Sequence, residues 1–191
     1  MSFRITKVYT KQGDQGETRL GGGQVVPKES LRIRTYGVVD ELNSAIGIAL
    51  AFEPVEPVTQ ALTRIQHQLF TLGGDLCVLQ EDKKKWRMAG IEAMDVTALE
   101  KVIDELNGQL PALEEFILPG GSTASAFLHQ ARCLCRRAET LLAELMRQEQ
   151  VSPFVLPYLN RLSDMLFVLA RYQNQATGIT EVSWQKDDNE I

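Results

Sequence analysis

Apolar residues recur at three- and four-residue steps along five stretches of the chain, the pattern of amphipathic helices that share one core. We therefore expect helices over about 31–52, 58–79, 95–106, 122–148 and 156–175. Pro54 and Pro57 separate the first two, because proline disfavours continuation of a helix. The sequence thus predicts an all-α fold, a five-helix antiparallel bundle over 31–176.

The two ends of the chain lack this periodicity. We expect a single domain over 1–191, with an irregular N-terminal loop over 1–30 and a short extended tail over 177–191. Apolar and polar residues alternate over 179–184, which is typical of a short strand or an extended tail. The charged run 81–85 is expected to be a solvated loop, and Asp95 is expected to cap the third helix.

Composition narrows the function classes. The net charge of −5 argues against nonspecific binding to nucleic acid or to an anionic membrane, which requires a basic surface. No apolar run approaches the roughly 20 residues of a membrane span, and the N-terminus lacks the apolar segment of a signal peptide. We therefore expect a cytoplasmic protein, and any polyanion must be bound by a few locally placed cations.

Cysteine and histidine positions give no metal-ligand set. Cys133 and Cys135 are two residues apart on one helix and point to nearly opposite sides, so joint chelation is disfavoured. With Cys77 they make an odd count, which favours reduced, structural thiols. His67 and His129 lie outside any Glu-x-x-His pair, which disfavours a di-iron site, and we expect both at a helix surface or an interface.

A polar strip interrupts the fourth predicted helix. Arg132, Arg136 and Glu139 share one side of that helix at i, i+4 and i+7, whereas Arg137 points elsewhere. Taken alone, the strip is interpreted either as a salt-bridged solvated face or as a clamp for an anionic ligand, and we favour the first. The rest of the chain shifts this balance.

Glycines and hydroxyl residues gather in the N-terminal loop. Gly13 and Gly16 allow positive φ and let backbone N–H groups converge, as in an anion-binding nest, with Lys11 as an adjacent cation. A flexible N-terminal arm explains the composition equally well. Lys28 is either a surface lysine or a second cation for the same anion.

Further polar and aromatic positions leave alternatives open. Asp40 interrupts the apolar stripe of the first helix and is either a solvent-facing charge or an interface carboxylate. Asn160, Asp164 and Arg171 form a second polar strip, on the last helix. Phe116 is either a core residue or the wall of a pocket, and we favour the core. Polar residues on apolar stripes indicate an internal site or a subunit interface.

Four motifs occur in a fixed order along the chain. They are Thr10-Lys11-x-Gly13-Asp14-x-Gly16-x-Thr18, Gly37-x-x-Asp40-Glu41-Leu42-Asn43-Ser44, Arg136-Arg137-Ala138-Glu139 and Tyr158-Leu159-Asn160-Arg161-Leu162-Ser163-Asp164. Each motif is weak by itself, but together they resemble the PduO-type ATP:cob(I)alamin adenosyltransferases. The resemblance covers nearly the whole chain, although the glycine run 21–23 differs from many relatives.

The resemblance implies a homotrimer of five-helix bundles with each active site between two subunits. It implies ATP and cobalamin as substrates, Mg²⁺ as an expected ion, and a cobalamin reductase and an adenosylcobalamin-dependent acceptor enzyme as partners, with no nucleic acid and no membrane. The implied nucleotide contacts are Thr10, Lys11, Gln12, Gly13, Thr18, Arg19, Lys28, Arg136, Arg137, Ala138, Glu139, Thr140 and Asn160.

The resemblance also implies the residues that act in catalysis, namely Arg132, Arg136, Asp40 and Phe116. Arg132 and Asp40 match a pair that bridges subunits beside the nucleotide. Phe116 matches the aromatic residue on the lower face of the corrin, where the cofactor's own base would otherwise coordinate cobalt. Excluding that ligand would make four-coordinate cob(II)alamin easier to reduce.

The implied reaction is direct attack of Co(I) on the 5′ carbon of ATP, giving adenosylcobalamin and triphosphate. Cob(I)alamin is already a strong nucleophile, and the sequence shows neither a Ser-His-Asp pattern nor a poised Cys-His pair. The protein would contribute positioning and stabilisation of the leaving triphosphate. The alternatives are an ATP-binding cobalamin chaperone or sensor without essential turnover, and a purely structural helical oligomer, which the glycine loop and the arginine strip disfavour.

Overall fold

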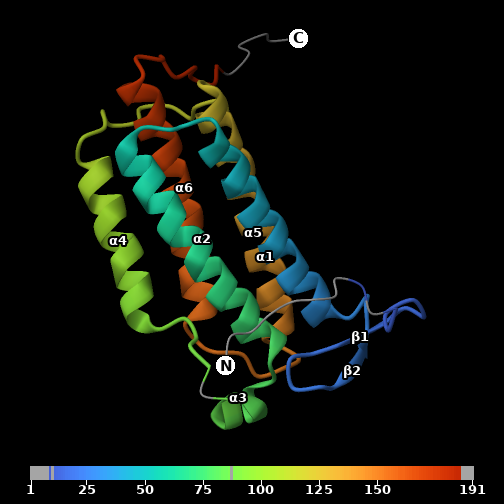
Figure 1. Ribbon diagram of the computed structural model, residues 1–191. Coiled ribbons are helices and arrows are strands. Elements are labelled where there is room, and N and C mark those ends of the chain that lie inside the picture. Colours follow the sequence, from blue (N-terminus) through green and yellow to red (C-terminus); the bar gives the residue numbers. More distant parts are fainter. Residues whose placement is uncertain (1–8, 10, 87, 186–191) are drawn as a thin grey trace, which may run out of the picture.

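Five long helices form an antiparallel bundle in the computed structural model, which describes residues 9, 11–86 and 88–185 (Figure 1). They are α1 (Leu31–Ala51), α2 (Glu56–Cys77), α4 (Ala93–Asn107), α5 (Thr123–Leu145) and α6 (Val155–Ala176). A short helix, α3 (Gln80–Trp86), follows α2. Ahead of α1, strands β1 (Glu17–Arg19) and β2 (Val25–Pro27) pair as an antiparallel ribbon. The predicted all-α five-helix bundle is confirmed, with this ribbon and α3 as additions.

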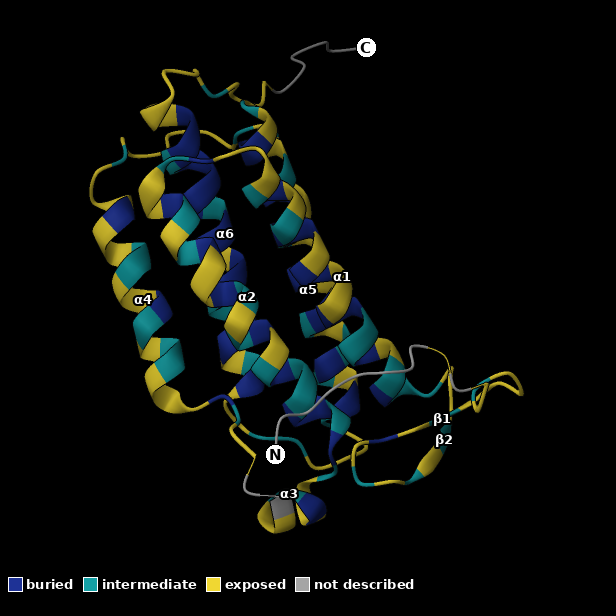
Figure 2. Cartoon of the chain, in the orientation of Figure 1, coloured by how far each residue is buried: buried dark blue, intermediate teal, exposed yellow. Residues whose placement is uncertain are grey.

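The packing order places two helix pairs around a common core. α1 packs on α2 and on α5, α5 packs on α6, and α4 lies against α6. Buried residues follow the inward side of each long helix, and exposed residues follow the outer side (Figure 2). The groove between α1 and α2 and the groove between α5 and α6 therefore open on different faces of the bundle.

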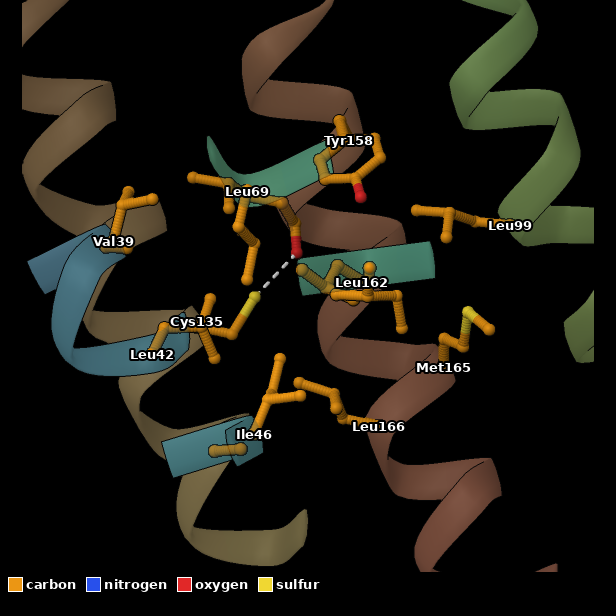
Figure 3. Packing of buried hydrophobic residues seen from close by; sticks show 14 of the residues in the cluster. Val39, Leu42, Ile46, Leu69, Leu99, Cys135, Tyr158, Leu162, Met165 and Leu166 are labelled. Carbon is orange, nitrogen blue, oxygen red and sulfur yellow. Dashed lines mark hydrogen bonds between the residues drawn. The ribbon is translucent and has the colours of Figure 1, made fainter. Parts of the chain in front are cut away.

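Two polar side chains inside the core form hydrogen bonds to neighbouring helices. The Cys135 thiol donates to the carbonyl oxygen of Leu159 at 3.2 Å, among leucine and isoleucine side chains from α1, α2 and α6 (Figure 3). Burial raises the pKa of this thiol. The Tyr158 hydroxyl donates to Gln68 Oε1 at 3.0 Å. Cys133 is exposed, so the two neighbouring cysteines do face opposite sides, as predicted.

The charged run 81–85 is helical, so the predicted solvated loop is wrong. Asp82 is buried and accepts hydrogen bonds from Lys85 Nζ at 2.7 Å and from Gln24 Nε2 at 2.5 Å. These bonds lower the pKa of the Asp82 carboxyl. Lys83 pairs with the buried Asp75 of α2. Lys85 pairs with Asp82 within one turn, whereas Gln24 comes from a distant part of the sequence, and the local pattern carries no sign of that partner.

Helix ends agree with the sequence in part. Ser122, a residue type that is preferred at helix N-caps, caps α5 and accepts a hydrogen bond from the Ser125 N–H at 3.2 Å. Asp95 is not the N-cap of α4, because the helix begins two residues earlier, at Ala93, with Glu92 as its N-cap. The Asp95 carboxylate instead accepts a hydrogen bond from the Glu92 N–H at 2.9 Å, the second half of a capping box.

The described part of the C-terminal tail, up to residue 185, includes an isolated antiparallel bridge between Ile117 and Ser183, within the predicted extended stretch 179–184. Gly178 ends the last helix with a φ of +69°, a conformation that glycine adopts without strain. Among the described residues, no helix is long and apolar enough to cross a membrane.

Candidate functional site

A cavity of about 360 Å³ opens between α5 and α6. Its lining comes from α5, from α6 and from the segment before α5, and consists of Leu113, Phe116, Ile117, Arg132, Arg136, Ser163, Asp164, Phe167 and Val168. Phe116 is 80% exposed, so the favoured expectation of a core position is wrong. Its segment runs over the surface, and the ring walls the cavity instead.

The two arginines of the cavity carry charge that no described carboxylate neutralises. Neither Arg132 nor Arg136 forms an ion pair with a described residue. The Arg132 guanidinium lies over the Phe167 ring, 5.9 Å from its centroid. Arg132 Nε is buried without a hydrogen-bond partner in the described part of the chain. Two cations of this kind favour an anionic group supplied from outside the protomer.

Glu139 continues the polar strip one turn further along α5. Its Oε1 accepts a hydrogen bond from Asn160 Nδ2 of α6 at 2.9 Å. The hydroxyl of Thr140 donates to the Arg136 carbonyl at 2.9 Å, so this side chain is engaged within its own helix. The strip is therefore braced by α6 rather than salt-bridged along α5.

Two of the implied nucleotide contacts lie away from this cavity. Arg137 pairs with Glu41 of α1, which agrees with the prediction that it points to another side. Ala138 is fully buried in the core. Within one protomer the structure brings Arg132 and Arg136 together but leaves these two residues outside the cavity.

Asp40 lies in a different cavity, of about 340 Å³, between α1 and α2. Its neighbours there include Tyr36, Phe70 and the Gly73-Gly74 pair, and Phe70 is 77% exposed. A Cβ atom at Gly73 would meet nothing within 4 Å, so Gly73 faces open space, whereas one at Gly74 would lie 3.5 Å from Met88 Cε. This cavity shares no lining residue with the one that contains Arg132. One protomer alone does not join the implied pair.

The N-terminal loop encloses a third cavity, of about 410 Å³. Its lining consists of Gln12, Gly13, Glu17, Thr18, Arg19 and Val25. Lys28 lies directly behind Gly13, since a Cβ atom there would come within 3.0 Å of Lys28 Nζ. Lys11 adopts a positive φ of 61° at the start of the loop. Lys28 therefore reaches the same loop as a second cation, whereas Thr10 lies outside the described residues.

The loop is docked on the bundle, which argues against the flexible-arm interpretation. The Gly21 N–H donates to the Cys77 carbonyl at 2.8 Å, and Gln24 donates to Asp82. A Cβ atom at Gly21 would lie 2.6 Å from Val78 Cγ2, and one at Gly22 would lie 2.5 Å from Asp82 Oδ2. The glycine run 21–23 therefore permits a close approach to the end of α2 and to α3. Sequence reasoning missed Cys77 and Asp82 as docking partners, and no local signal marks them.

His129 lies behind the arginines and is 3% exposed, so the expected surface or interface position is wrong. Its ring meets the Phe167 ring edge-on, with centroids 6.0 Å apart. Neither ring nitrogen has a hydrogen-bond partner among the described residues. Burial, with a smaller contribution from the charge of Arg132, lowers the pKa of His129 to about 4. At neutral pH this histidine is uncharged, so the positive charge near the cavity comes from Arg132 and Arg136.

Comparison with known proteins identifies the family. The family described as "Cobalamin adenosyltransferase" matches residues 8–173 of this chain. The chain belongs to this family.

Related adenosyltransferases match over nearly their whole length. The "Corrinoid adenosyltransferase" of Bacillus subtilis is 45% identical over 184 residues, which cover 94% of this chain and 93% of that protein. The "Cobalamin adenosyltransferase" of Cupriavidus metallidurans is 47% identical over 189 residues, covering 98% of each. The family resemblance inferred from the four motifs is confirmed.

Solved adenosyltransferases also share the fold. A variant of the PduO-type ATP:corrinoid adenosyltransferase from Lactobacillus reuteri, complexed with cobalamin and ATP, aligns with a TM-score of 0.89 and 37% identity. The alignment covers 94% of this chain and 100% of that one. This chain is therefore an adenosyltransferase in fold and in enzyme class.

Proposed function

We propose that this adenosyltransferase transfers the 5′-deoxyadenosyl group of ATP to the cobalt of cob(I)alamin, at sites shared between neighbouring copies of a homotrimer. The observation that supports the shared site is the separation of Asp40 from Arg132. Each lies in its own cavity, and neither forms an ion pair with another residue in the described part of the chain. A second copy that sets its α1/α2 face against the α5/α6 face of the first would pair the carboxylate with the guanidinium.

The nucleotide end of the proposed site combines the N-terminal loop of one copy with the α5 strip of the next. Lys11, Lys28 and Arg136 supply three positive charges for the triphosphate. Glu139 and Asn160, joined by their hydrogen bond, orient the arginine side of the site. The other contacts in this proposal are Thr10, Gln12, Gly13, Thr18, Arg19, Arg137, Ala138 and Thr140.

The corrinoid end is the apolar part of the α5/α6 cavity. Phe116 and Phe167 present aromatic surface there, and the Arg132 guanidinium lies over the second ring. An exposed phenylalanine that packs under the corrin would keep water and the corrinoid's own base away from cobalt. This would favour four-coordinate cob(II)alamin, which is easier to reduce to the nucleophilic Co(I) state.

The chain's residues position the substrates and stabilise charge, because Co(I) itself attacks the 5′ carbon of ATP. In that step a cobalt–carbon bond forms, the carbon–oxygen bond to the triphosphate breaks, and the electron pair of that bond leaves with the triphosphate. Cations fixed around the departing group lower the barrier without needing to reorganise. The buried Cys135 and His129 are both neutral near pH 7 and take no part as nucleophile or base.

Mg²⁺ fits this site as an ion held chiefly by the triphosphate. The described residues contain no group of three or more His, Cys, Asp or Glu side chains that could hold a metal. Mg²⁺ commonly binds through one or two carboxylates together with substrate phosphates. Glu139 is the carboxylate on the strip that would serve, and the ion would neutralise part of the leaving group's charge.

One assay tests the function. Purified protein, ATP and Mg²⁺ are mixed anaerobically with chemically reduced cobalamin, and the cobalt–carbon product and triphosphate are measured together. We expect both in equal amounts. Binding of ATP and cobalamin without product would favour the chaperone or sensor, and absence of binding would reject both functions. A reductase that supplies Co(I) and an adenosylcobalamin-dependent acceptor enzyme complete the proposal as partners.

A further inference from the structure

The segment that carries Phe116 is held in place by the C-terminal tail. The Trp184 N–H donates to the Phe116 carbonyl at 2.6 Å, and the Leu118 N–H donates to the Val182 carbonyl at 2.8 Å. These two bonds flank the isolated bridge described above and fix the backbone on both sides of it. The tail therefore acts as a strand partner for a segment that pairs with no other strand in the described part of the chain.

A single buried side chain ties both strands of this bridge to the bundle. Arg171 of α6 is 3% exposed. Its Nε donates to Glu181 Oε2 of the tail at 3.1 Å, and its Nη2 donates to the Pro111 carbonyl at 2.9 Å. One guanidinium thus reaches the tail and the start of the Phe116 segment at the same time.

The segment separates two hollows. On one side is the α5/α6 cavity, and on the other is a cavity of about 540 Å³ lined in part by Arg171 and Glu181. Leu113 and Ile117 line both cavities. Because the 111–118 segment has a cavity on each side, few side chains pack against it. Its position therefore depends on the hydrogen bonds that it forms with the tail and with Arg171.

The Arg171–Glu181 pair acts from outside the cavity that it affects. Arg171 follows Phe167 by four residues, so both share one side of α6, but neither Arg171 nor Glu181 lines the α5/α6 cavity. Loss of one partner of a buried ion pair leaves an uncompensated charge, so the pair resists opening. The Arg171–Glu181 ion pair can therefore hold the tail in a fixed position beside the 111–118 segment.

We propose that Arg171 and Glu181 are positioning residues for the corrinoid substrate, which hold the 111–118 segment against the tail and so set where Phe116 stands in the cavity. This inference rests on the proposed function. It assigns a role in corrinoid binding to two residues that touch neither ATP nor the corrinoid.

The first test compares Glu181 and Glu149, two carboxylates that each accept a hydrogen bond from a buried arginine. Arg32 offers a match, because it donates to Glu149 Oε2 at 2.8 Å and to the Leu76 carbonyl at 2.7 Å, distant from the Phe116 segment. We expect Glu181→Gln to raise the KM for reduced cobalamin about tenfold and to leave the KM for ATP within about twofold, since displacing a substrate contact by about 1 Å has effects of this order or larger. Glu149→Gln is expected to change neither.

The second test is spectroscopic and does not disturb the core. Trp184→Pro removes the N–H that donates to Phe116, whereas Trp184→Ala keeps it. With ATP and cob(II)alamin bound, electron paramagnetic resonance reports the four-coordinate fraction. We expect the proline variant to lose most of the four-coordinate signal and the alanine variant to retain more of it, with thermal midpoints close to that of the unaltered protein.

The outcomes separate the two proposals. If the unaltered protein makes no adenosylcobalamin, the proposed function fails. If it is active and Glu181→Gln leaves the corrinoid KM unchanged, or Trp184→Pro keeps as much of the four-coordinate signal as Trp184→Ala, the positioning role is wrong. Equal losses for ATP and corrinoid, or equal effects of Glu149→Gln and Glu181→Gln, would also overturn it, because they indicate general loss of structure.

Discussion

Asn160 of α6 donates a hydrogen bond from Nδ2 to Glu139 Oε1 of α5 at 2.9 Å, and its own Oδ1 accepts one from Arg161 Nη1 at 2.7 Å. Asn160 thus connects Glu139 of α5 to Arg161, its neighbour on α6. Glu139 follows Arg136 by three residues, so the network fixes a carboxylate about one turn along α5 from the arginine that lines the α5/α6 cavity. The Glu139 end of the strip is therefore held by α6 rather than by a salt bridge along α5.

Arg136→Ala is expected to lower kcat by about two orders of magnitude, the scale of removing one charge-stabilising donor. The physical reason is loss of a fixed positive charge beside the departing triphosphate. Steady-state rates at saturating ATP and cobalamin check this. Arg147→Ala removes an exposed arginine after the end of α5 and serves as the control. A near-normal kcat for Arg136→Ala would contradict the assigned role.

Phe116→Ala is expected to leave ATP affinity intact and to suppress the four-coordinate cob(II)alamin signal. Removing the exposed ring opens the lower side of the corrin site to water or to the corrinoid's base. Calorimetry with ATP and paramagnetic resonance of bound cob(II)alamin measure the two effects. Phe154→Ala, another exposed phenylalanine, should change neither. An unchanged signal in the Phe116 variant would reject the assignment.

Mixing two inactive variants tests whether the site is shared between copies. Asp40→Ala and Arg136→Ala alter cavities that share no lining residue within one protomer. If each site takes Asp40 from one copy and Arg136 from the next, random reassembly of equal amounts restores about a quarter of the sites. Activity that stays at the average of the two variants after verified subunit exchange would place the whole site in one protomer.

Gly22→Ala is expected to raise the KM for ATP several-fold with little loss of overall stability. The new methyl group would lie 2.5 Å from Asp82 Oδ2, so the Gln24–Asp82 hydrogen bond must break or shift. The N-terminal loop then loses this contact with α3. Gly120→Ala, where a Cβ atom would meet nothing within 4 Å, is the matched control. Equal KM values for the two variants would show that docking of the loop does not govern ATP binding.

His129 is expected to make the folded state less stable in acid. Its pKa of about 4 in the folded protein lies below the ordinary value of 6.5, so its contribution is fully present above pH 6.5 and is lost as the pH falls towards 4. The loss amounts to about 2 kcal/mol of unfolding free energy by pH 5. Urea unfolding at pH 7 and pH 5 measures it.

Two histidine variants serve as comparisons for this pH effect. His129→Leu removes the titrating group and should weaken the pH dependence by that amount. His67→Gln alters an exposed histidine and should leave the dependence unchanged. A slope that is the same in all three proteins would indicate that the buried imidazole is not responsible.

The sequence by itself determined the five long helices, their inward faces and the family, because helical periodicity and short motifs are local properties. The predicted opposite sides of Cys133 and Cys135 are confirmed for the same reason. The strip with Arg136 and Glu139 was likewise visible, since residues three and four apart share a helix face.

Only the tertiary structure decided where polar groups far apart in the sequence meet. Asp82 is buried because Gln24 reaches it, and Arg171 is buried because Glu181 and Pro111 surround it. The exposed position of Phe116 follows from hydrogen bonds to the tail. Burial of a charge or exposure of an aromatic ring depends on such distant partners, and the spacing of residues along one helix contains no information about them.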